Sequence, residues 1–310
     1  MKYRDWIKQW LDIYVKPSVK EKTYINYSTI ARVHLIPEIG DYELEELTLP
    51  VLQSFIVELG EKGNKLRGRG LEPSTVGVII SVLQRSLKFA FEIGISTAEH
   101  TSHLKRPKIM QKNVECFTVS EQKKIESHLL SIAPDKKLGI LICLYTGLRI
   151  GELLALKWSD VDTGYNFISV NATCRDACVN GTQIRVLSTP KTVTSRRVIP
   201  IPKQLKPYLK ALKRISKGEY VISGNKEREV SVRSYQKMFS NLLKCLNIKH
   251  RGFHSLRHTF ATRALECGMD VRTLAEIMGH KNPQITLNRY AHSMIEHKIA
   301  MMNRVGKFLQ

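Results

Sequence analysis

The 310-residue sequence lacks the features that would place it in or across a membrane. A helix that spans a bilayer needs about 18 or more apolar residues in a row. The longest apolar run, LGILICLY at 138–145, has the length of a buried helix segment instead. The N-terminus, MKYRDWIKQW, does not contain the apolar core of a signal peptide. We therefore expect a protein that stays in the cytoplasm.

The sequence also has few cysteines, and their spacing excludes the usual cysteine-rich sites. None of the six forms a CxxC pair, and the closest two, Cys174 and Cys178, fall in a polar stretch that we interpret as a loop. A zinc site would require two more ligands at a regular spacing. The cysteines are therefore expected to be ordinary reduced thiols.

Acidic residues are in short supply, because 28 Asp and Glu oppose 49 Lys and Arg and leave a formal net charge of +21. Such an excess favours a polyanionic partner, either a nucleic acid or a membrane surface. Hydrophobic residues make up 43% of the chain and charged residues 25%, as in an ordinary globular protein. A chain of this length suits two domains that each bury a core.

The first part of the chain, to about residue 105, is predicted to be all helical. Apolar residues recur there at helical spacing, and Pro or Gly marks the ends of the segments. The predicted helices comprise residues 6–14, 21–35, 50–59 and 74–93. A basic loop before the last helix contains Lys65, Arg67 and Arg69. This loop is either a solvated surface or a clamp on a nucleic-acid phosphate.

The rest of the chain has a mixed pattern. Residues 106–114 are basic and lack periodicity, so they are predicted to form a linker. Beyond the linker, helical patterns flank short β-like segments at 166–170, 183–187 and 196–201. The predicted fold class is therefore mainly α with a small β-sheet. It comprises a helical domain at 1–105 and a mixed α+β domain at 115–310 that ends in a tail helix.

Two sequence clusters place an arginine near other ionisable residues, a glutamate in one cluster and two histidines in the other. In TGLRIGELLALKW, Arg149 lies between apolar segments, where a guanidinium is costly to bury unless a neighbour such as Glu152 neutralises it. A simple structural ion pair also fits this cluster. In FHSLRHTFATR, the side chains of His254, Arg257 and His258 share one face of a predicted helix.

The histidine–arginine face has two candidate ligands, a metal ion and an oxyanion. A zinc protease site would need a Glu beside the first histidine, and Arg257 between the two histidines would repel a cation. An oxyanion suits the cluster better, because the guanidinium fork matches two phosphoryl oxygens. His258 is expected to be a packed helix residue rather than a ligand.

Two further residues are inconspicuous alone but complete a pattern. His280 precedes a predicted helix that Asn282 caps and Pro283 begins, and Tyr290 lies near the end of that helix. In order along the chain, TGLRIGELLALKW, HSLRHTFATR, MGHKN and NRYAH resemble the signature of the tyrosine recombinase (phage integrase) family. Lys191 in STPKTVTSRRVIPIP matches the family's basic hairpin residue, in a tight turn between two strand-like runs.

The N-terminal segment carries an independent resemblance. The string TYINYSTIARVHLIPEIGDYELEELT resembles the family's helical, SAM-like core-binding domain. Together with the motifs above, the resemblance to the family covers about residues 3 to 308. The resemblance implies a core-binding domain at 1–105 and a catalytic domain at 115–310. Some family members carry an additional arm-binding domain before the core-binding one, whereas here Met1 is followed directly by the core-binding segment. We therefore expect either the two-domain form of the family or a chain from which such a domain has been removed.

The resemblance assigns a role to each member of the pattern. It implies that Arg149 and Arg257 grip the non-bridging oxygens of the scissile phosphate and that Glu152 buttresses Arg149. Tyr290 would be the nucleophile. Fixed cations lower the barrier because negative charge gathers on the equatorial oxygens during the attack. A phenol with a pKa near 10 also needs a base and neighbouring cations before it attacks.

The remaining members would handle protons and DNA contacts. The resemblance implies that Lys191 is the general acid for the leaving 5′-oxygen, His254 an acid/base partner and His280 a hydrogen-bond donor to the phosphoryl group. Arg196 and Arg197, together with the basic loop, are expected to contact the DNA backbone. No cofactor is expected, since the phosphotyrosine link keeps the bond energy and the sequence has neither a Walker loop nor a carboxylate pair.

The expected function is that of the integrase or excision enzyme of a mobile genetic element. Its partners would be double-stranded DNA with inverted-repeat core sites, three further copies in a synaptic homotetramer, and an excisionase or another directionality factor. Two other classes share parts of the pattern. A DNA-binding regulator that lost the chemistry would lack a catalytic member. A type IB topoisomerase would relax supercoiled plasmid that carries no target site.

Overall fold

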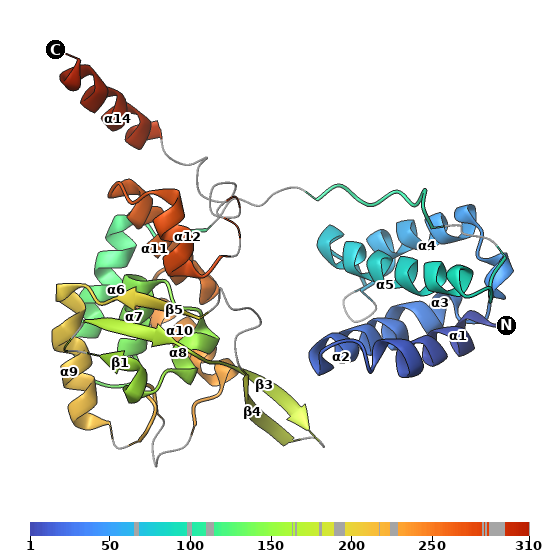
Figure 1. Ribbon diagram of the computed structural model, residues 1–310, viewed down its shortest axis with the longest axis horizontal. Helices are drawn as coiled ribbons and strands as arrows, with labels where there is room; N and C mark the ends of the chain where they lie inside the picture. The colour runs from blue at the N-terminus through green and yellow to red at the C-terminus, as the bar shows by residue number, and fades with distance from the viewer. Residues whose placement is uncertain are drawn as a thin grey trace. The chain divides into compact units, whose positions relative to one another are not determined.

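The computed structural model describes residues 1–64, 68–97, 101–109, 115–162, 164, 166–179, 182–188, 196–216, 218–223, 229–280, 282, 284 and 295–309 (Figure 1). The chain divides into two compact units, Met1–Lys112 and Asn113–Gln310, so the division lies within the segment 106–114. Helices predominate in both units, and among the described residues the strands all belong to the second. The predicted fold class is confirmed. Among the helices of the described ranges, none has the length and apolar character needed to cross a bilayer.

The first unit consists of helices, as its periodicity predicts. They are α1 (Tyr3–Gln9) with its π-helical continuation (Trp10–Val15), α2 (Glu21–Ile30) with a second π-helical stretch (Ala31–Leu35), α3 (Ile36–Ile39), α4 (Leu49–Lys62) and α5 (Pro73–Glu92). Pro50 and Pro73 stand in the first turns of α4 and α5, where a missing N–H costs nothing. The predicted helix at 21–35 is continuous through the π-helical stretch.

The core of the first unit joins its first helix to its last. Tyr3 and Trp6 of α1 are fully buried. The Tyr3 hydroxyl lies 2.9 Å from Oγ of Ser86 on α5, and the Trp6 indole donates to the Ser86 carbonyl at 3.0 Å. Burial raises the pKa of Tyr3 far above its usual value, so this phenol stays neutral and holds its hydrogen bond.

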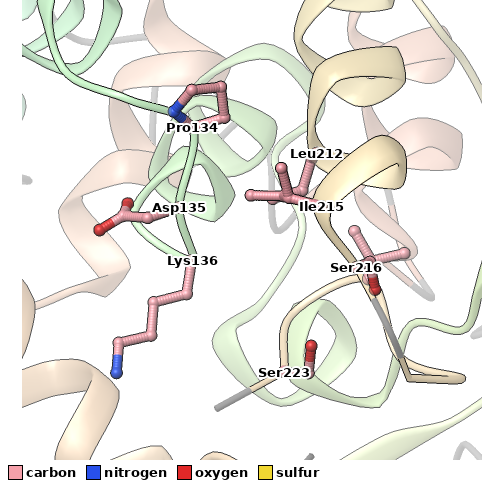
Figure 2. Close-up of a pocket in the computed structure, with 8 residues that line it drawn as sticks. Pro134, Asp135, Lys136, Leu212, Ile215, Ser216 and Ser223 are labelled. Carbon is pink, nitrogen blue, oxygen red and sulfur yellow. The ribbon is translucent and has the colours of Figure 1, made fainter. Parts of the chain in front are cut away.

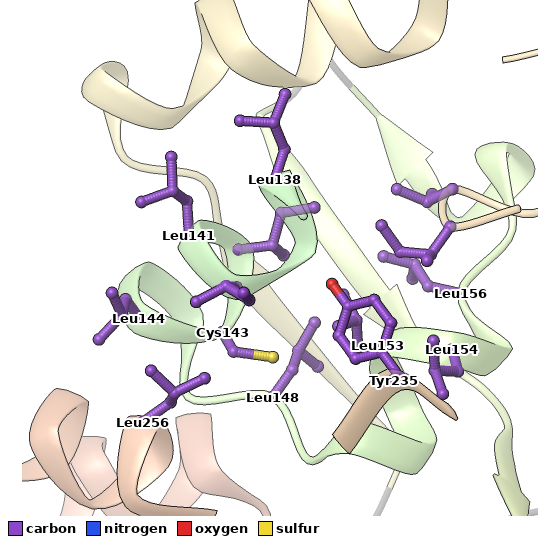
Figure 3. Close-up of a cluster of buried hydrophobic side chains, with 14 of the residues drawn as sticks. Leu138, Leu141, Cys143, Leu144, Leu148, Leu153, Leu154, Leu156, Tyr235 and Leu256 are labelled. Atoms are coloured by element: carbon purple, nitrogen blue, oxygen red, sulfur yellow. The ribbon is translucent and has the colours of Figure 1, made fainter. Parts of the chain in front are cut away.

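The second unit packs its helices around one buried helix. Its helices are α6 (Val119–Ser131), α7 (Leu138–Thr146), α8 (Ile150–Ala155), α9 (Lys206–Ile215), α10 (Val232–Cys245), α11 (His254–Glu266), α12 (Val271–Met278) and α14 (Ile295–Phe308). All of α7 except Tyr145 is buried, as its uniformly apolar sequence requires. Figure 3 shows Leu138, Leu141 and Leu144 in one cluster with Leu153 of α8.

Five short strands form two antiparallel sheets in the described ranges. They are β1 (Val161–Asp162), β2 (Phe167–Val170), β3 (Thr173–Val179), β4 (Thr182–Ser188) and β5 (Arg197–Pro200). One sheet has the order β1-β2-β5, and Ile168 of β2 faces Ile199 of β5. The other is the hairpin β3-β4, in which Cys174 faces Leu187.

The hairpin corrects two expectations. The polar stretch around Cys174 and Cys178 is not a loop but strand β3, with Cys174 buried. Its polar residue Asp176 accepts hydrogen bonds from the backbone N–H groups of Val232 and Arg233 at 2.9 and 2.8 Å, so it caps α10. The two strands on either side of Lys191 also belong to different sheets, rather than to one hairpin closed by a tight turn. Lys191 itself lies outside the described residues.

Candidate active site

A sharp corner between α7 and α8 presents the first arginine. Gly147 ends α7 with a φ of +66°, and a Cβ there would lie 2.5 Å from the ring of Phe260. Glycine therefore fits both the backbone conformation and the close approach of α11. Two residues later Arg149, in an extended conformation, is the N-cap of α8. Its side chain is 37% exposed, so this guanidinium is open to a ligand on one side.

Glu152 holds Arg149 from the first turn of α8. The Arg149 backbone N–H donates to Oε2 of Glu152 at 2.9 Å, and Nη1 donates to Oε1 at 2.7 Å. Arg197 of β5 occupies the same carboxylate with Nη1 at 3.1 Å from Oε1 and Nη2 at 2.8 Å from Oε2. Glu152 is 6% exposed and Arg197 is 5% exposed, so this is a buried carboxylate between two guanidinium groups.

The charge of Glu152 is secured by its partners. Burial alone would raise the pKa of this carboxyl group. The hydrogen bonds and charge of Arg197, with those of Arg149, outweigh burial and lower the pKa to about 2. Glu152 is therefore ionised at every physiological pH and keeps both arginines in place.

The second arginine, Arg257 of α11, is 2% exposed, and both Nη atoms of its guanidinium group donate hydrogen bonds. Nη1 donates to the Gly147 carbonyl at 2.6 Å, and Nη2 donates to the Met278 carbonyl. Nη2 also lies 3.1 Å from Nε2 of His280. Arg257 therefore connects the α7–α8 corner to the end of α12 and to the histidine that follows it.

Three guanidinium groups donate hydrogen bonds to the carbonyls at the C-terminal end of α12. The carbonyls of Ile277, Met278 and Gly279 accept hydrogen bonds from Arg197, Arg257 and Arg149, respectively. The last carbonyls of a helix have no partner within the helix and lie at the negative end of its dipole. This end of α12 therefore attracts the cations and fixes them close together.

Four of the predicted site residues thus come together: Arg149, Glu152, Arg257 and His280. His254 begins α11 with an exposed side chain, and its ring centre lies 4.6 Å from that of His258 in an edge-on arrangement. Tyr290, like Lys191, lies outside the described residues.

The expected DNA contacts divide into two groups. Arg69 and Arg196 are exposed, whereas Lys65 and Arg67 lie outside the described residues. Arg197 requires a correction, because its side chain is buried on Glu152 instead of lying on the surface.

The period of the strand could have revealed the inward direction of Arg197. Ile199 is 2% exposed and Val198 is 57% exposed. Residues two apart on a strand share a face, so Arg197 points inward with Ile199.

A cavity of about 220 Å³ lies elsewhere in the second unit, between the segment that precedes α7 and the end of α9 (Figure 2). Pro134, Asp135 and Lys136 line one side, and Ile215 and Ser216 line the other. Its lining shares no residue with the arginine cluster, so it is separate from the candidate active site.

Comparison with known proteins gives consistent matches. Residues 116–297 match the phage integrase family, and residues 2–60 match the N-terminal SAM-like domain of phage integrases. The tyrosine recombinase XerC-like of Caldanaerobacter subterraneus is 27% identical, over 95% of this chain and 80% of that protein. The transposase from transposon Tn916 of Enterococcus faecalis is 28% identical, over 74% of this chain and 62% of the transposase. This chain thus spans less than two thirds of that transposase.

The fold has a close counterpart among solved structures. The Tn1549 transposon integrase in complex with a circular intermediate DNA superposes with a TM-score of 0.82. The alignment covers 98% of this chain and 99% of that chain, at 22% sequence identity. The two chains therefore share their fold in both units.

Proposed function

This chain belongs to the phage integrase family of tyrosine recombinases, and from that premise we propose that it cleaves and rejoins DNA at specific sites. The observation that carries the proposal is the pair Arg149 and Arg257 beside His280: Glu152 holds Arg149, and both guanidinium groups donate to successive carbonyls at the end of α12. We assign residues 1–105 to core binding, 106–114 to a linker and 115–310 to catalysis.

The two arginines suit the charge that a phosphodiester develops. During in-line attack, negative charge gathers on the equatorial oxygens of the phosphate, so cations fixed beforehand lower the barrier. Both Nη atoms of Arg257 are tied to backbone carbonyls, so this guanidinium is held in place before DNA binds. In our proposal Arg149 and Arg257 bind the two non-bridging oxygens, and His280 donates a hydrogen bond to one of them.

The proposed cleavage step balances without a cofactor. The Tyr290 oxygen forms a bond to phosphorus, the bond to the 5′-oxygen breaks, and Lys191 gives that oxygen its proton. His254, the proposed acid/base partner, accepts the proton that the Tyr290 hydroxyl loses as its oxygen attacks. The 3′-phosphotyrosyl bond keeps the energy of the phosphodiester, so a 5′-hydroxyl can reverse the step and rejoin the strand without ATP or metal.

The substrate we propose is the DNA of a mobile genetic element. The similarity to the Tn916 transposase supports this choice. The DNA partner would be a duplex with inverted-repeat core sites, on which four copies assemble. Apolar side chains along α14 support assembly, because Ile299 and Met302 are 56% and 69% exposed. An excisionase is a further proposed partner, and the proposed place of the reaction is the cytoplasm.

The decisive experiment traps the covalent intermediate. A nicked suicide duplex carrying the element's end, incubated with the full chain, should give a protein–DNA adduct on a denaturing gel. Tyr290→Phe should bind the duplex with wild-type affinity and give no adduct, since only the nucleophilic oxygen is lost. An adduct that persists in Tyr290→Phe would contradict the assignment of the nucleophile. Steady relaxation of plasmid lacking any core site would instead indicate a topoisomerase.

A further inference from the structure

Arg197 is a buried arginine to which the family resemblance assigns no catalytic role, yet it contacts two parts of the candidate active site. Its Nη atoms bind both oxygens of Glu152 at 3.1 and 2.8 Å. Its Nε donates to the carbonyl of Ile277, in the last turn of α12. One side chain therefore joins the start of α8, which carries Arg149, to the end of α12, which precedes His280.

The hydrogen bonds of Glu152 explain why this link matters for Arg149. Each carboxylate oxygen of Glu152 accepts one bond from Arg149 and one from Arg197. The other end of the Arg149 fork reaches the Gly279 carbonyl only at 3.4 Å, and its side chain is partly open to solvent. In the described part of the site, Glu152 is thus the strongest constraint on the position of Arg149. Arg197 in turn holds the carboxylate of Glu152 in place through two hydrogen bonds.

The backbone of Gly279 is shaped to admit Arg197. Gly279 has a φ of +62°, and a Cβ at this position would lie 3.0 Å from Nη1 and 3.1 Å from Cδ of Arg197. The guanidinium therefore packs against the bare backbone at the end of α12. Both the conformation and the contact favour glycine here.

We propose that Arg197 is a positioning residue for strand cleavage, which sets Glu152 and thereby Arg149 against the end of α12 that presents His280. This inference rests on the proposed function. Arg197 does not touch the phosphate; it determines where the guanidinium of Arg149 lies when the phosphate arrives. Displacement of a catalytic group by about 1 Å can reduce a rate by about a hundredfold.

The test compares Arg197→Met with a matched arginine elsewhere in the unit. Methionine keeps the length of the stem and removes the guanidinium. Arg263 on α11 is the control, because it is partly buried, pairs with Glu266 and donates to the Phe117 carbonyl at 3.0 Å. We expect Arg197→Met to cleave the suicide duplex about 10- to 100-fold more slowly, because a misplacement of a catalytic group by about 1 Å can cost about a hundredfold. Arg263→Met should cleave at close to the wild-type rate.

Two readouts separate positioning from a merely structural effect. In the background of Arg149→Ala, Arg197→Met should cause little further loss, because Arg197 acts through the guanidinium that Arg149→Ala has already removed. With a neutral methylphosphonate at the scissile position, the defect of Arg197→Met should shrink, since that substrate carries no charge for Arg149 to stabilise. Arg197→Lys keeps the charge and should retain part of the activity, and it replaces Arg197→Met if the latter does not fold.

Each outcome bears on one of the two proposals. If the wild-type chain forms no adduct, the proposed function is wrong. If it does, the inference about Arg197 is overturned by a rate for the Arg197 variant equal to that of Arg263→Met. Fully additive losses with Arg149→Ala, or an undiminished defect on the methylphosphonate, would overturn it as well.

Discussion

The carboxylate of Glu152 is almost completely buried, and it accepts four hydrogen bonds from protein groups. A buried carboxylate is stable only when such partners replace water. The same bonds keep it ionised, with a pKa of about 2 against an ordinary value of 4.5. At the scale of single residues, the Glu152 carboxylate thus lies between the guanidinium groups of Arg149 and Arg197, and the exposed side of Arg149 can bind a second anion, the phosphate.

The depressed pKa of Glu152 predicts a pH-dependent contribution to stability. Because the folded pKa lies below the unfolded one, the contribution is fully present above about pH 4.5 and is lost as the pH falls toward about 2. At neutral pH it should amount to about 3 kcal/mol. Urea unfolding of wild type and Glu152→Gln should show a difference in unfolding free energy that shrinks between pH 5 and pH 3. A difference independent of pH would contradict this account.

The fork of Arg257 predicts that a lysine cannot replace it. Its Nη atoms bind the carbonyls of Gly147 and Met278, which lie at the ends of two different helices, α7 and α12. The single ammonium of a lysine cannot reach both carbonyls and the phosphate. Arg257→Lys should therefore lower the cleavage rate by about a hundredfold or more.

DNA affinity of the same variant should change little, because the chain has 49 Lys and Arg residues and the contacts with the DNA backbone are expected to be spread over many of them. A gel-shift titration and a single-turnover cleavage assay measure the two quantities separately. Wild-type cleavage by Arg257→Lys would show that the bidentate geometry is not needed.

The sequence predicts those site residues whose partners lie nearby or within the family signature. Arg149 and Glu152 are three residues apart, so local spacing indicates their pair. Arg197 is 45 residues from Glu152, and no local pattern reports a contact of that separation. Its basic neighbour Arg196 made both arginines look like surface groups.

At the scale of elements, the end of α12 holds the arginines of the site through its carbonyls. Gly279 at this end is the position at which a side chain would be least tolerated. An alanine there would adopt a left-handed φ, which costs about 1–2 kcal/mol, and its Cβ would press on Arg197. Gly279→Ala should therefore lose stability and also cleave about 10- to 100-fold more slowly.

Gly268 provides the matched control. It has a φ of +88°, and a Cβ there would have nothing within 4 Å. Gly268→Ala should show a similar loss of unfolding free energy with nearly unchanged cleavage. Equal cleavage by the two variants would mean that the contact between Gly279 and Arg197 does not matter for the reaction.

Helices were predicted more reliably than strands, for a physical reason. A helix such as the segment 21–35 or α7 satisfies its backbone internally, so its own sequence carries the signal. Strand β3 depends on pairing with β4 and on packing against α8 and α10. Its polar residue Asp176 looks like part of a loop until the N-terminus of α10 supplies its partners.

At the scale of the whole molecule, the ordered set of motifs identified the family although no single motif was specific. The match to the phage integrase family over 116–297 confirms that reading. The surface, by contrast, could not be predicted in detail. A net charge of +21 indicates a polyanion but not which face binds it.

The tail helix α14 predicts how copies of the chain assemble. Ile299, Met302 and Val305 are 56%, 69% and 49% exposed, and a short helix with an open apolar stripe is marginal in water. If a neighbouring copy covers this stripe, deletion of residues 295–310 should reduce synaptic complexes on native gels far more than binding of one copy to one site.

Point variants on the same helix sharpen this test of assembly. Ile299→Gln combined with Met302→Gln should reproduce the deletion, because the pair removes the apolar stripe and leaves the helix and its charges in place. Arg304→Gln on the opposite face of α14 is the control and should assemble normally. If all variants give the wild-type ladder of complexes, the tail folds back on its own unit and the stripe serves that unit alone.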